Sequence, residues 1–342
     1  MKKFLALMLA AMLVFALVGC GNGAAEAEDD GTLTFAIVVR SAGNPFMERM
    51  AYGFVTATES MGHNAVVIYP EDMSAEAQIG AINTLIAQGV DGIAVAANDP
   101  YALESALNSA RGQGIAVITL DGDAAGSSLF VNQAGVREVG QALVDSVYDM
   151  TGGSGQFALL SATSTSPNQN AWIAAMHDII DGDPRYAGLE WVATVFGDDE
   201  AQRSFDEAQS LLINFPDLRV IVAPTTVGIL AAAQVVQLQN SDVLIAGLGL
   251  PSEMRGLVGP GLPCPYMYLW NTVDLGAVGA YALTAIHGGG TTGAVGESFT
   301  VEGRNFQVIP GIPELGIMSN QIIIGPPFRF DESNIDYWAE IL

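Results

Sequence analysis

The sequence predicts an α/β protein made of two doubly wound parallel-sheet lobes. From Leu33 onward, short β-branched runs alternate with longer amphipathic stretches, which is typical of parallel strands covered by helices on both faces. Length supports two lobes, because about 310 residues follow the N-terminal leader and a domain takes roughly 100–200 residues. Half of the residues are apolar, so each lobe can bury a core.

The first lobe is expected to contain four β-α units. Its strands are the apolar runs 33–39, 65–69, 93–97 and 116–120. Its helices are the amphipathic stretches 46–61, 75–88 and 101–113, each long enough for three or more turns.

The second lobe begins after Phe130-Val131-Asn132 and repeats the same alternation. We expect helices over 136–150, 169–180, 201–215 and 228–238, and strands over 156–160, 189–196, 219–223 and 243–247. A strand over 267–270 and a helix over 275–287, which ends at the glycine run 288–290, add to one sheet or the other.

The first 19 residues are expected to be a lipoprotein signal peptide. Two lysines precede an apolar run that is shorter than the roughly 20 residues a membrane span needs. Leu17-Val18-Gly19-Cys20 resembles the bacterial lipobox, which implies a lipid on Cys20 and an exported protein anchored to the outer face of the cytoplasmic membrane. Residues 20–31 are expected to form a flexible tether. The alternative is an N-terminal anchor helix that is not removed.

The charge balance excludes several kinds of partner. Both lysines lie in the signal, so the mature chain has ten arginines against 37 acidic residues, a formal charge of −27. Such a surface repels phosphate backbones, and we expect no nucleic-acid binding. The lysine-free acidic surface also suggests adaptation to high salt, with compositional drift as the alternative. If Cys20 is acylated, Cys264 has no intrachain partner.

The polar segments after the strands indicate where a ligand would sit, because the carboxyl ends of parallel strands border a crevice. These segments are rich in acids, amides and aromatic rings but poor in cations, which suits a neutral polyhydroxylated ligand. Asp121, followed by Gly122, is either a ligand acceptor or a cap, and Asn168 has the same two interpretations. Asp198 is expected to contact the ligand from the second lobe. The segments are 40–46, 98–100, 121–123, 164–170, 197–199, 224–226, 247–251 and 270–271.

Several of these segments carry a resemblance that runs from about Leu33 to Asp336. The motifs are Asn44-Pro45-Phe46, Ala97-Asn98-Asp99-Pro100, Leu120-Asp121-Gly122-Asp123, Phe130-Val131-Asn132-Gln133, Asn168-Gln169-Asn170-Ala171-Trp172, Ala223-Pro224-Thr225-Thr226-Val227-Gly228, Gly247-Leu248-Gly249-Leu250-Pro251-Ser252, Leu269-Trp270-Asn271 and Asn334-Ile335-Asp336. In their order and spacing they resemble type 1 periplasmic binding proteins, within them the rhamnose-binding and autoinducer-2-binding lipoprotein branch of sugar ABC importers.

The resemblance implies a three-crossover hinge that closes the lobes around a ligand and hands it to a membrane permease. It places the crossovers near 130–133, 247–251 and 288–295. Lobe one is then expected to be 32–130 plus 249–290, and lobe two 131–248 plus 291–342. The implied partners are a small neutral sugar or sugar-like ligand and an ABC permease, and we expect a monomer without cofactor.

The resemblance also implies site residues. Asp121, Gln169 and Pro224 match the autoinducer-2 receptors, whereas Arg40, Asn168 and Thr226 replace their lysine, aspartate and alanine. These departures favour a rhamnose-like monosaccharide, with an autoinducer-2 receptor as the alternative. Trp270 is either a sugar platform or a core ring, and the proline-rich loop 259–265 departs from the family pattern. The expected ligand-binding residues are Arg40, Asn44, Phe46, Asp121, Asn168, Gln169, Asp198, Pro224, Thr226, Trp270 and Asn271.

Two other classes of function lack support in the residues. His63, His177 and His287 are scattered through the sequence, and Cys264 stands between prolines without a second metal-ligating residue, so neither a metal nor an enzyme is expected. The chain has no GxSxG motif or P-loop at a strand-to-helix turn. A repressor of related fold would need a basic DNA-binding head, where this chain has a signal and an acidic tether.

Overall fold

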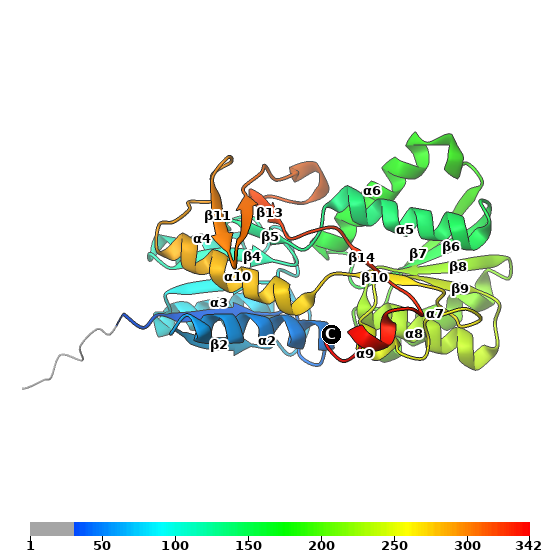
Figure 1. Ribbon diagram of the computed structural model, residues 1–342, viewed down its shortest axis with the longest axis horizontal. Helices are drawn as coiled ribbons and strands as arrows, with labels where there is room; N and C mark the ends of the chain where they lie inside the picture. The colour runs from blue at the N-terminus through cyan, green and yellow to red at the C-terminus, as the bar shows by residue number, and fades with distance from the viewer. Residues whose placement is uncertain (1–30) are drawn as a thin grey trace, which may run out of the picture. The chain divides into compact units, whose positions relative to one another are not determined.

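The computed structural model describes residues 31–342 (Figure 1). The expected signal peptide 1–19, the lipidation site Cys20 and the tether up to residue 30 lie outside the described residues. Among the residues that are described, no helix combines the length and the apolar character that crossing a membrane requires.

Lobe one is built around a six-stranded sheet in which every pairing is parallel. The strand order is β13-β5-β4-β3-β1-β2. The bounds are β1 (Thr34–Val38), β2 (Asn64–Ile68), β3 (Gly92–Val95), β4 (Ala116–Leu120), β5 (Phe130–Asn132) and β13 (Gln321–Ile323).

Alternate side chains of β1 enter two separate cores, as a sheet covered on both faces requires. Phe35 and Ile37 belong to the core that contains residues of α2 (Pro45–Ser60) and α10 (Thr272–His287). Ala36 and Val38 belong to the core that contains residues of the other two helices. These are α3 (Ala75–Gln88) and α4 (Glu104–Gly112). Both faces are therefore buried, which explains why the lobe-one strands are almost continuously apolar.

Lobe two contains a four-stranded parallel sheet in the order β7-β6-β8-β9. Two helix pairs pack on it, α5 with α6 and α7 with α8, and Figure 1 shows them on opposite sides of the sheet. The strands are β6 (Gly155–Ser161), β7 (Leu189–Phe196), β8 (Leu218–Ala223) and β9 (Leu244–Gly247). The helices are α5 (Val136–Thr151), α6 (Pro167–Gly182), α7 (Ala201–Asn214) and α8 (Thr226–Gln239).

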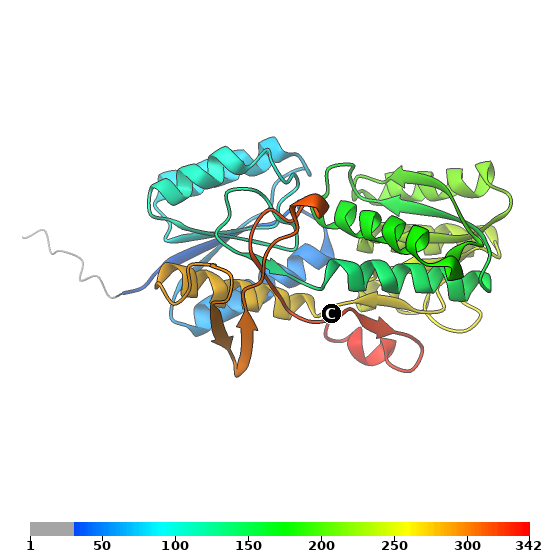
Figure 2. The same cartoon turned by 90° about the horizontal axis from the view of Figure 1, so that it is seen from above.

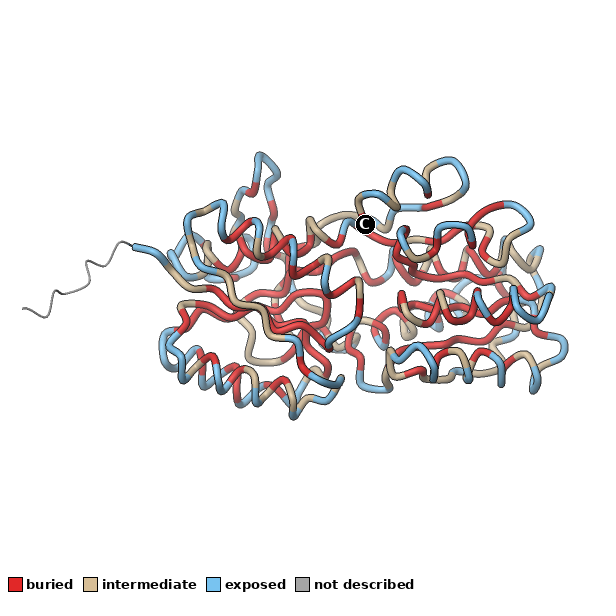
Figure 3. The backbone as a smooth tube through the Cα atoms, turned by 90° about the horizontal axis from the view of Figure 1, so that it is seen from below, coloured by how far each residue is buried: buried red, intermediate tan, exposed pale blue. Residues whose placement is uncertain are grey.

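The remaining elements are short and lie after β9 or near the C-terminus. In lobe two, β10 (Met267–Leu269) pairs antiparallel with β14 (Phe328–Phe330), and α9 (Pro251–Met254) contacts α11 (Ile335–Trp338). In lobe one, β11 (Ser298–Val301) and β12 (Arg304–Gln307) form a hairpin, followed by the 3-10 turn η2 (Pro313–Leu315). Figure 3 shows the strands of both lobes as buried backbone, with exposed residues on the outer turns of the helices.

The chain crosses between the lobes at different places from those expected, except for the first. That crossing follows β5, as predicted. The crossing expected at 247–251 is wrong, because the backbone N–H of Gly249 donates to Tyr268 O and keeps this segment in lobe two. The second crossing instead falls at 270–271, between β10 and α10, and the third at 324–327, between β13 and β14.

These crossings correct the expected membership of two segments. Residues 249–270 belong with lobe two, because β10 extends the β9 edge. Residues 291–323 belong with lobe one, because β13 pairs with β5 in the six-stranded sheet.

Two glycines let α10 pack closely against α2 where the chain returns to lobe one. A Cβ on Gly53 of α2 would lie 1.9 Å from Val273 O, and a Cβ on Gly276 of α10 would lie 1.9 Å from Met50 O. The two helix backbones therefore touch, and only glycine permits this approach at either point.

Candidate ligand-binding site

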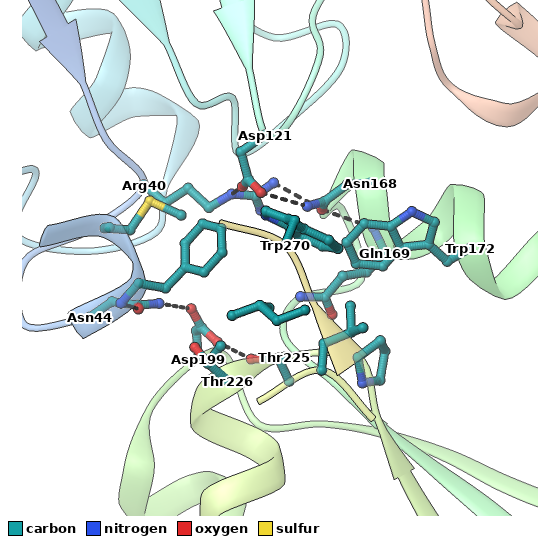
Figure 4. Close-up of a pocket in the computed structure, with 15 residues that line it drawn as sticks. Arg40, Asn44, Asp121, Asn168, Gln169, Trp172, Asp199, Thr225, Thr226 and Trp270 are labelled. Carbon is teal, nitrogen blue, oxygen red and sulfur yellow. Dashed lines mark hydrogen bonds and ion pairs between the residues drawn. The ribbon is translucent and has the colours of Figure 1, made fainter. Parts of the chain in front are cut away.

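A cavity of about 40 Å³ lies where the carboxyl ends of the strands of both lobes meet (Figure 4). Nine of the eleven residues expected to bind ligand line it: Arg40, Asn44, Phe46, Asp121, Asn168, Gln169, Pro224, Thr226 and Trp270. The other lining residues are not among those expected to bind ligand; they are Met47, Trp172, Asp199, Thr225, Leu248 and Leu269.

One polar end of the cavity is formed by Arg40, Asp121 and Asn168, which meet across the lobes. Arg40 Nε donates to Asp121 Oδ2 at 2.9 Å, and both side chains are almost completely buried. Arg40 Nη2 donates to Asn168 Oδ1 at 2.9 Å, and Asn168 Nδ2 donates to Asp121 Oδ1 at 3.3 Å. Since Arg40 and Asp121 belong to lobe one and Asn168 to α6 of lobe two, the expected confrontation of Asp121 with Asn168 is present.

The backbone around Asp121 is specialised to hold this carboxylate. Asp121 follows β4 with φ of 61°, a left-handed conformation that aspartate tolerates better than most residues. A Cβ on the next residue, Gly122, would lie 2.4 Å from Arg40 Nη2 and 2.6 Å from Ala97 O. Glycine at position 122 therefore lets the guanidinium lie against the backbone, so that Gly122 serves the site as well as the turn.

The other polar end contains Asp199, the neighbour of the expected contact Asp198. Asn44 Nδ2 of lobe one donates to Asp199 Oδ2 at 2.6 Å, and Thr225 Oγ1 donates to Asp199 Oδ1 in a short hydrogen bond. Burial raises the pKa of Asp199, while Thr225, Arg40 and Asn44 oppose the shift. Burial likewise raises the pKa of Asp121, against the attraction of Arg40.

Asp198 and Asn271 lie outside the cavity. The carboxylate of Asp198 turns to the exposed side of the β7–α7 turn, where it pairs with Arg203. Asn271 is the N-cap residue that precedes α10, and its side chain accepts from the backbone N–H of Asp274 at 3.0 Å. The side chain of Asn271 therefore caps α10.

An apolar wall joins the two polar ends. Trp270 follows β10 and lies between the lobes, with its ring 6.2 Å from Phe46 and 5.7 Å from Trp172 between centroids. Leu248 and Leu269 continue this wall. Rings and aliphatic side chains of this kind cover the C–H faces of a ligand, whereas the acids and amides at the two ends bind hydroxyl groups.

The side chain of Gln169 is fixed by hydrogen bonds within lobe two. Its Oε1 accepts from Ser161 Oγ at 2.5 Å and from the backbone N–H of Ala162 at 2.8 Å. Its Nε2 makes no hydrogen bond to any of the described residues, so this donor is available to a ligand. The fixed carbonyl orients the amide before any ligand arrives, which lowers the entropic cost of binding.

Glu253 of α9 is a carboxylate of lobe two that lies outside the lining of the cavity but is influenced by the charge of Asp199. Its Oε2 is buried and has no hydrogen-bond partner within residues 31–342. Burial, with repulsion from Asp199 and Glu48, raises the pKa of Glu253 from 4.5 to about 7. A raised carboxyl pKa means that the folded protein binds the proton more tightly than the unfolded chain, so this group favours folding less as pH rises from about 4.5 to about 7.

We therefore predict that the melting temperature of the wild-type protein falls more steeply between pH 5 and pH 7 than that of Glu253→Gln. Differential scanning fluorimetry across this range measures both profiles. Glu48→Gln removes one charge that repels the Glu253 carboxylate, so the melting temperature of this variant should fall at lower pH than that of wild type. Parallel profiles for wild type and Glu253→Gln would show that Glu253 titrates normally.

Histidine and cysteine serve packing at the positions described. The His177 ring stacks on Trp191, and the His63 ring packs edge-on against Phe35. Cys264 is buried, and burial raises the pKa of its thiol to about 12, which opposes nucleophilic chemistry. In the part of the chain that the structure covers, no group of three or more His, Cys, Asp or Glu side chains could hold a metal ion.

Comparisons with known proteins agree with this architecture. Residues 35–291 match the family model described as a periplasmic binding protein domain. A crystal structure of an ABC transporter solute-binding protein from Clostridium phytofermentas with bound L-rhamnose is 43% identical, with a TM-score of 0.88. The alignment covers 91% of this chain and 99% of that one.

Two other relatives are more distant. LsrB from Clostridium saccharobutylicum in complex with AI-2 is 21% identical over 89% of this chain and 99% of its own, with a TM-score of 0.82. The D-apiose import binding protein of Paraburkholderia graminis is 24% identical over 75% of this chain and 80% of its own length. The relatives are substrate-binding proteins and not enzymes, and this chain belongs to the type 1 periplasmic binding protein family of ABC transporter components.

Proposed function

We propose that the protein captures an L-rhamnose-like monosaccharide in the interlobe cavity and presents it to an ABC permease from a lipid anchor on Cys20. One observation carries the proposal: acids and amides from both lobes meet at one cavity that also has an aromatic wall. A ligand gripped from both sides favours the closed arrangement, because its contacts are complete only there. The L-rhamnose bound to the 43% identical relative supports this class of ligand.

The polar ends favour a neutral ligand with hydroxyl groups on opposite sides. Arg40 has five N–H donors, and three hydrogen bonds to Asp121, Ser166 and Asn168 account for three of them. Each oxygen of Asp199 accepts one hydrogen bond, which leaves lone pairs for ligand hydroxyls. An anionic ligand would be repelled by Asp199, whereas a sugar can accept from Arg40 and donate to Asp199.

The apolar wall favours a 6-deoxy sugar over its 6-hydroxy counterpart. L-Rhamnose carries a methyl group where L-mannose carries a hydroxymethyl group, and L-lyxose has the same ring without this carbon. Burying a methyl group contributes about 0.8 kcal/mol, or roughly fourfold in affinity. Burying an unpartnered hydroxyl costs about 1–3 kcal/mol, or roughly 5- to 150-fold.

Isothermal titration calorimetry with these three sugars tests the proposal. We expect L-rhamnose to bind more tightly than L-lyxose, and L-lyxose at least as tightly as L-mannose. D-Ribose, D-apiose and autoinducer-2 complete the panel, with a nucleoside and a branched amino acid as negative controls. Preferential binding of autoinducer-2 would make the protein a signal receptor, against the replacements at Arg40, Asn168 and Thr226. Absence of binding by every sugar would contradict the proposal.

The anchor is tested separately. Cys20→Ser should release the protein from the membrane fraction while leaving sugar affinity unchanged, because Cys20 is remote in sequence from every residue of the cavity.

A further inference from the structure

A hairpin of lobe one reaches over to lobe two beside the ligand cavity. Residues 309–321, which we name the clasp hairpin, pair antiparallel at Ile309 with Gln321 and at Ile312 with Ile317. Its tip is η2, which contacts α6 of lobe two. Figure 2 shows the orange-red tip beside the green end of α6, between the lobes.

The clasp hairpin lies behind two side chains that line the ligand cavity. Gly316 and Ile317 share a second cavity, of about 10 Å³, with Asn168 and Trp172 of α6. The same Asn168 and Trp172 line the ligand cavity. The tip is also close to the first turn of α6, since a Cβ on Gly316 would lie 4.0 Å from Pro167 O. The hairpin and a bound ligand would therefore contact the start of α6 from two sides.

A buried carboxylate that the ligand cavity does not use braces the base of the hairpin. Asp123 Oδ2 accepts from the backbone N–H of Ser319 at 2.7 Å, and Asp123 Oδ1 accepts from Ser319 Oγ at 2.9 Å. Thr119 Oγ1 of β4 donates to Asp123 Oδ1 at 2.5 Å. Asp123 is 2% exposed and has no cationic partner among the described residues, so its cost of burial is offset by these hydrogen bonds. The brace ties the hairpin to β4, two residues from Asp121.

We propose that the clasp hairpin holds the lobes closed, with Asp123 as its positioning residue. The hairpin is part of lobe one and α6 is part of lobe two, so a rotation of the lobes that separates η2 from α6 breaks their contact. A contact made in only one of two states shifts the equilibrium toward that state. The clasp therefore retains the ligand by slowing opening, although the hairpin itself does not line the ligand cavity. The proposal takes L-rhamnose as its ligand from the proposed function.

The test uses a variant that lacks the tip of the clasp hairpin and keeps its base. Ile312 and Ile317 exchange two backbone hydrogen bonds, of 2.9 and 3.2 Å, around four residues. Replacing 313–316 by Asn-Gly leaves this pair joined by a type I′ turn, which suits a two-residue hairpin. The matched control is Glu302→Asn in the turn between β11 and β12, a lobe-one hairpin whose Glu302 has φ of 48°.

Stopped-flow tryptophan fluorescence of the full chain with L-rhamnose gives the two rate constants. We expect the shortened hairpin to raise the dissociation rate at least fivefold, the lower end of typical coupling between sites, with association within twofold of wild type. In the ligand-free protein, amide hydrogen exchange should accelerate in peptides covering 119–125 and 160–172 and stay unchanged in β11 and β12. Asp123→Asn should act in the same direction and add little to the shortened variant, because both changes act through one contact.

The outcomes separate the two proposals. Unchanged dissociation and exchange in the shortened variant would overturn the clasp. Faster exchange throughout lobe one, together with a lower melting temperature, would also overturn it, since the hairpin would then support the lobe and not its closure. If wild type fails to bind L-rhamnose, the proposed function fails, and hydrogen exchange of the ligand-free protein still decides the clasp.

Discussion

Asp121→Ala is expected to weaken L-rhamnose binding at least tenfold and to lower the free energy of unfolding. The substitution leaves the guanidinium of Arg40 buried without its counter-ion, and removing one partner of a buried ion pair costs about 3–5 kcal/mol. The ligand also loses a charged hydrogen-bond partner, which contributes roughly 1.5–3 kcal/mol. Isothermal titration calorimetry and urea denaturation measure the two effects.

The matched control is Asp336→Ala. Asp336 pairs with Arg255 on the surface, with 75% and 49% of the two side chains exposed, and exposed pairs contribute little. Neither sugar affinity nor stability should change in this variant. Asp121→Asn, which retains an acceptor for Arg40 Nε, should lie between wild type and Asp121→Ala. Wild-type affinity in Asp121→Ala would show that the ligand binds elsewhere.

Trp270→Ala is expected to produce a second loss of at least tenfold in affinity. Trp270 is 5% exposed, and its ring lies between Phe46 of lobe one and Trp172 of lobe two. Truncating a buried tryptophan costs about 3–5 kcal/mol of stability, and the ligand loses the apolar face that covers its C–H groups. Calorimetric titration and thermal unfolding report on the two losses.

Trp270→Phe distinguishes the contribution of the aromatic ring from that of the indole N–H group. The indole Nε1 is buried and has no partner within the described residues, so phenylalanine removes no hydrogen bond from the ligand-free protein. We expect Trp270→Phe to retain most of the affinity. Trp191→Phe, at the His177 stack of lobe two, is the control and should bind as wild type does. Equal affinities in Trp270→Ala and wild type would contradict the role of the aromatic wall.

The elements of the fold are largely readable from the sequence because their signals are local. The strand predicted over 189–196 and the helix over 75–88 agree with β7 and α3 in both bounds. Hydrophobic periodicity and turn residues determine such elements over one short window. The short strands β11 to β14 were not predicted, because no long helices separate them and a strand of three or four residues gives no pattern of its own.

The sequence does not show to which lobe the C-terminal segments belong. β13 pairs with β5, which lies nearly 200 residues earlier in the chain, and nothing near Gln321 indicates this partner. The expected crossing at 288–295 followed a glycine run, but the chain stays in lobe one until 324 because the base of the clasp hairpin leads into β13. Pairing between distant strands is a tertiary choice that local sequence does not encode.

The sequence by itself determined the alternation of strands and helices, the acidic surface and most of the residues that line the cavity, because each depends on residue type and on position after a strand. Tertiary structure alone decided between Asp198 and Asp199. Both follow β7 with positive φ, at 52° and 56°, yet one pairs with Arg203 outside and the other reaches Asn44 across the lobes. Tertiary structure also brought in Trp172 from the second turn of α6, since which face of a helix meets a cavity depends on how that helix packs.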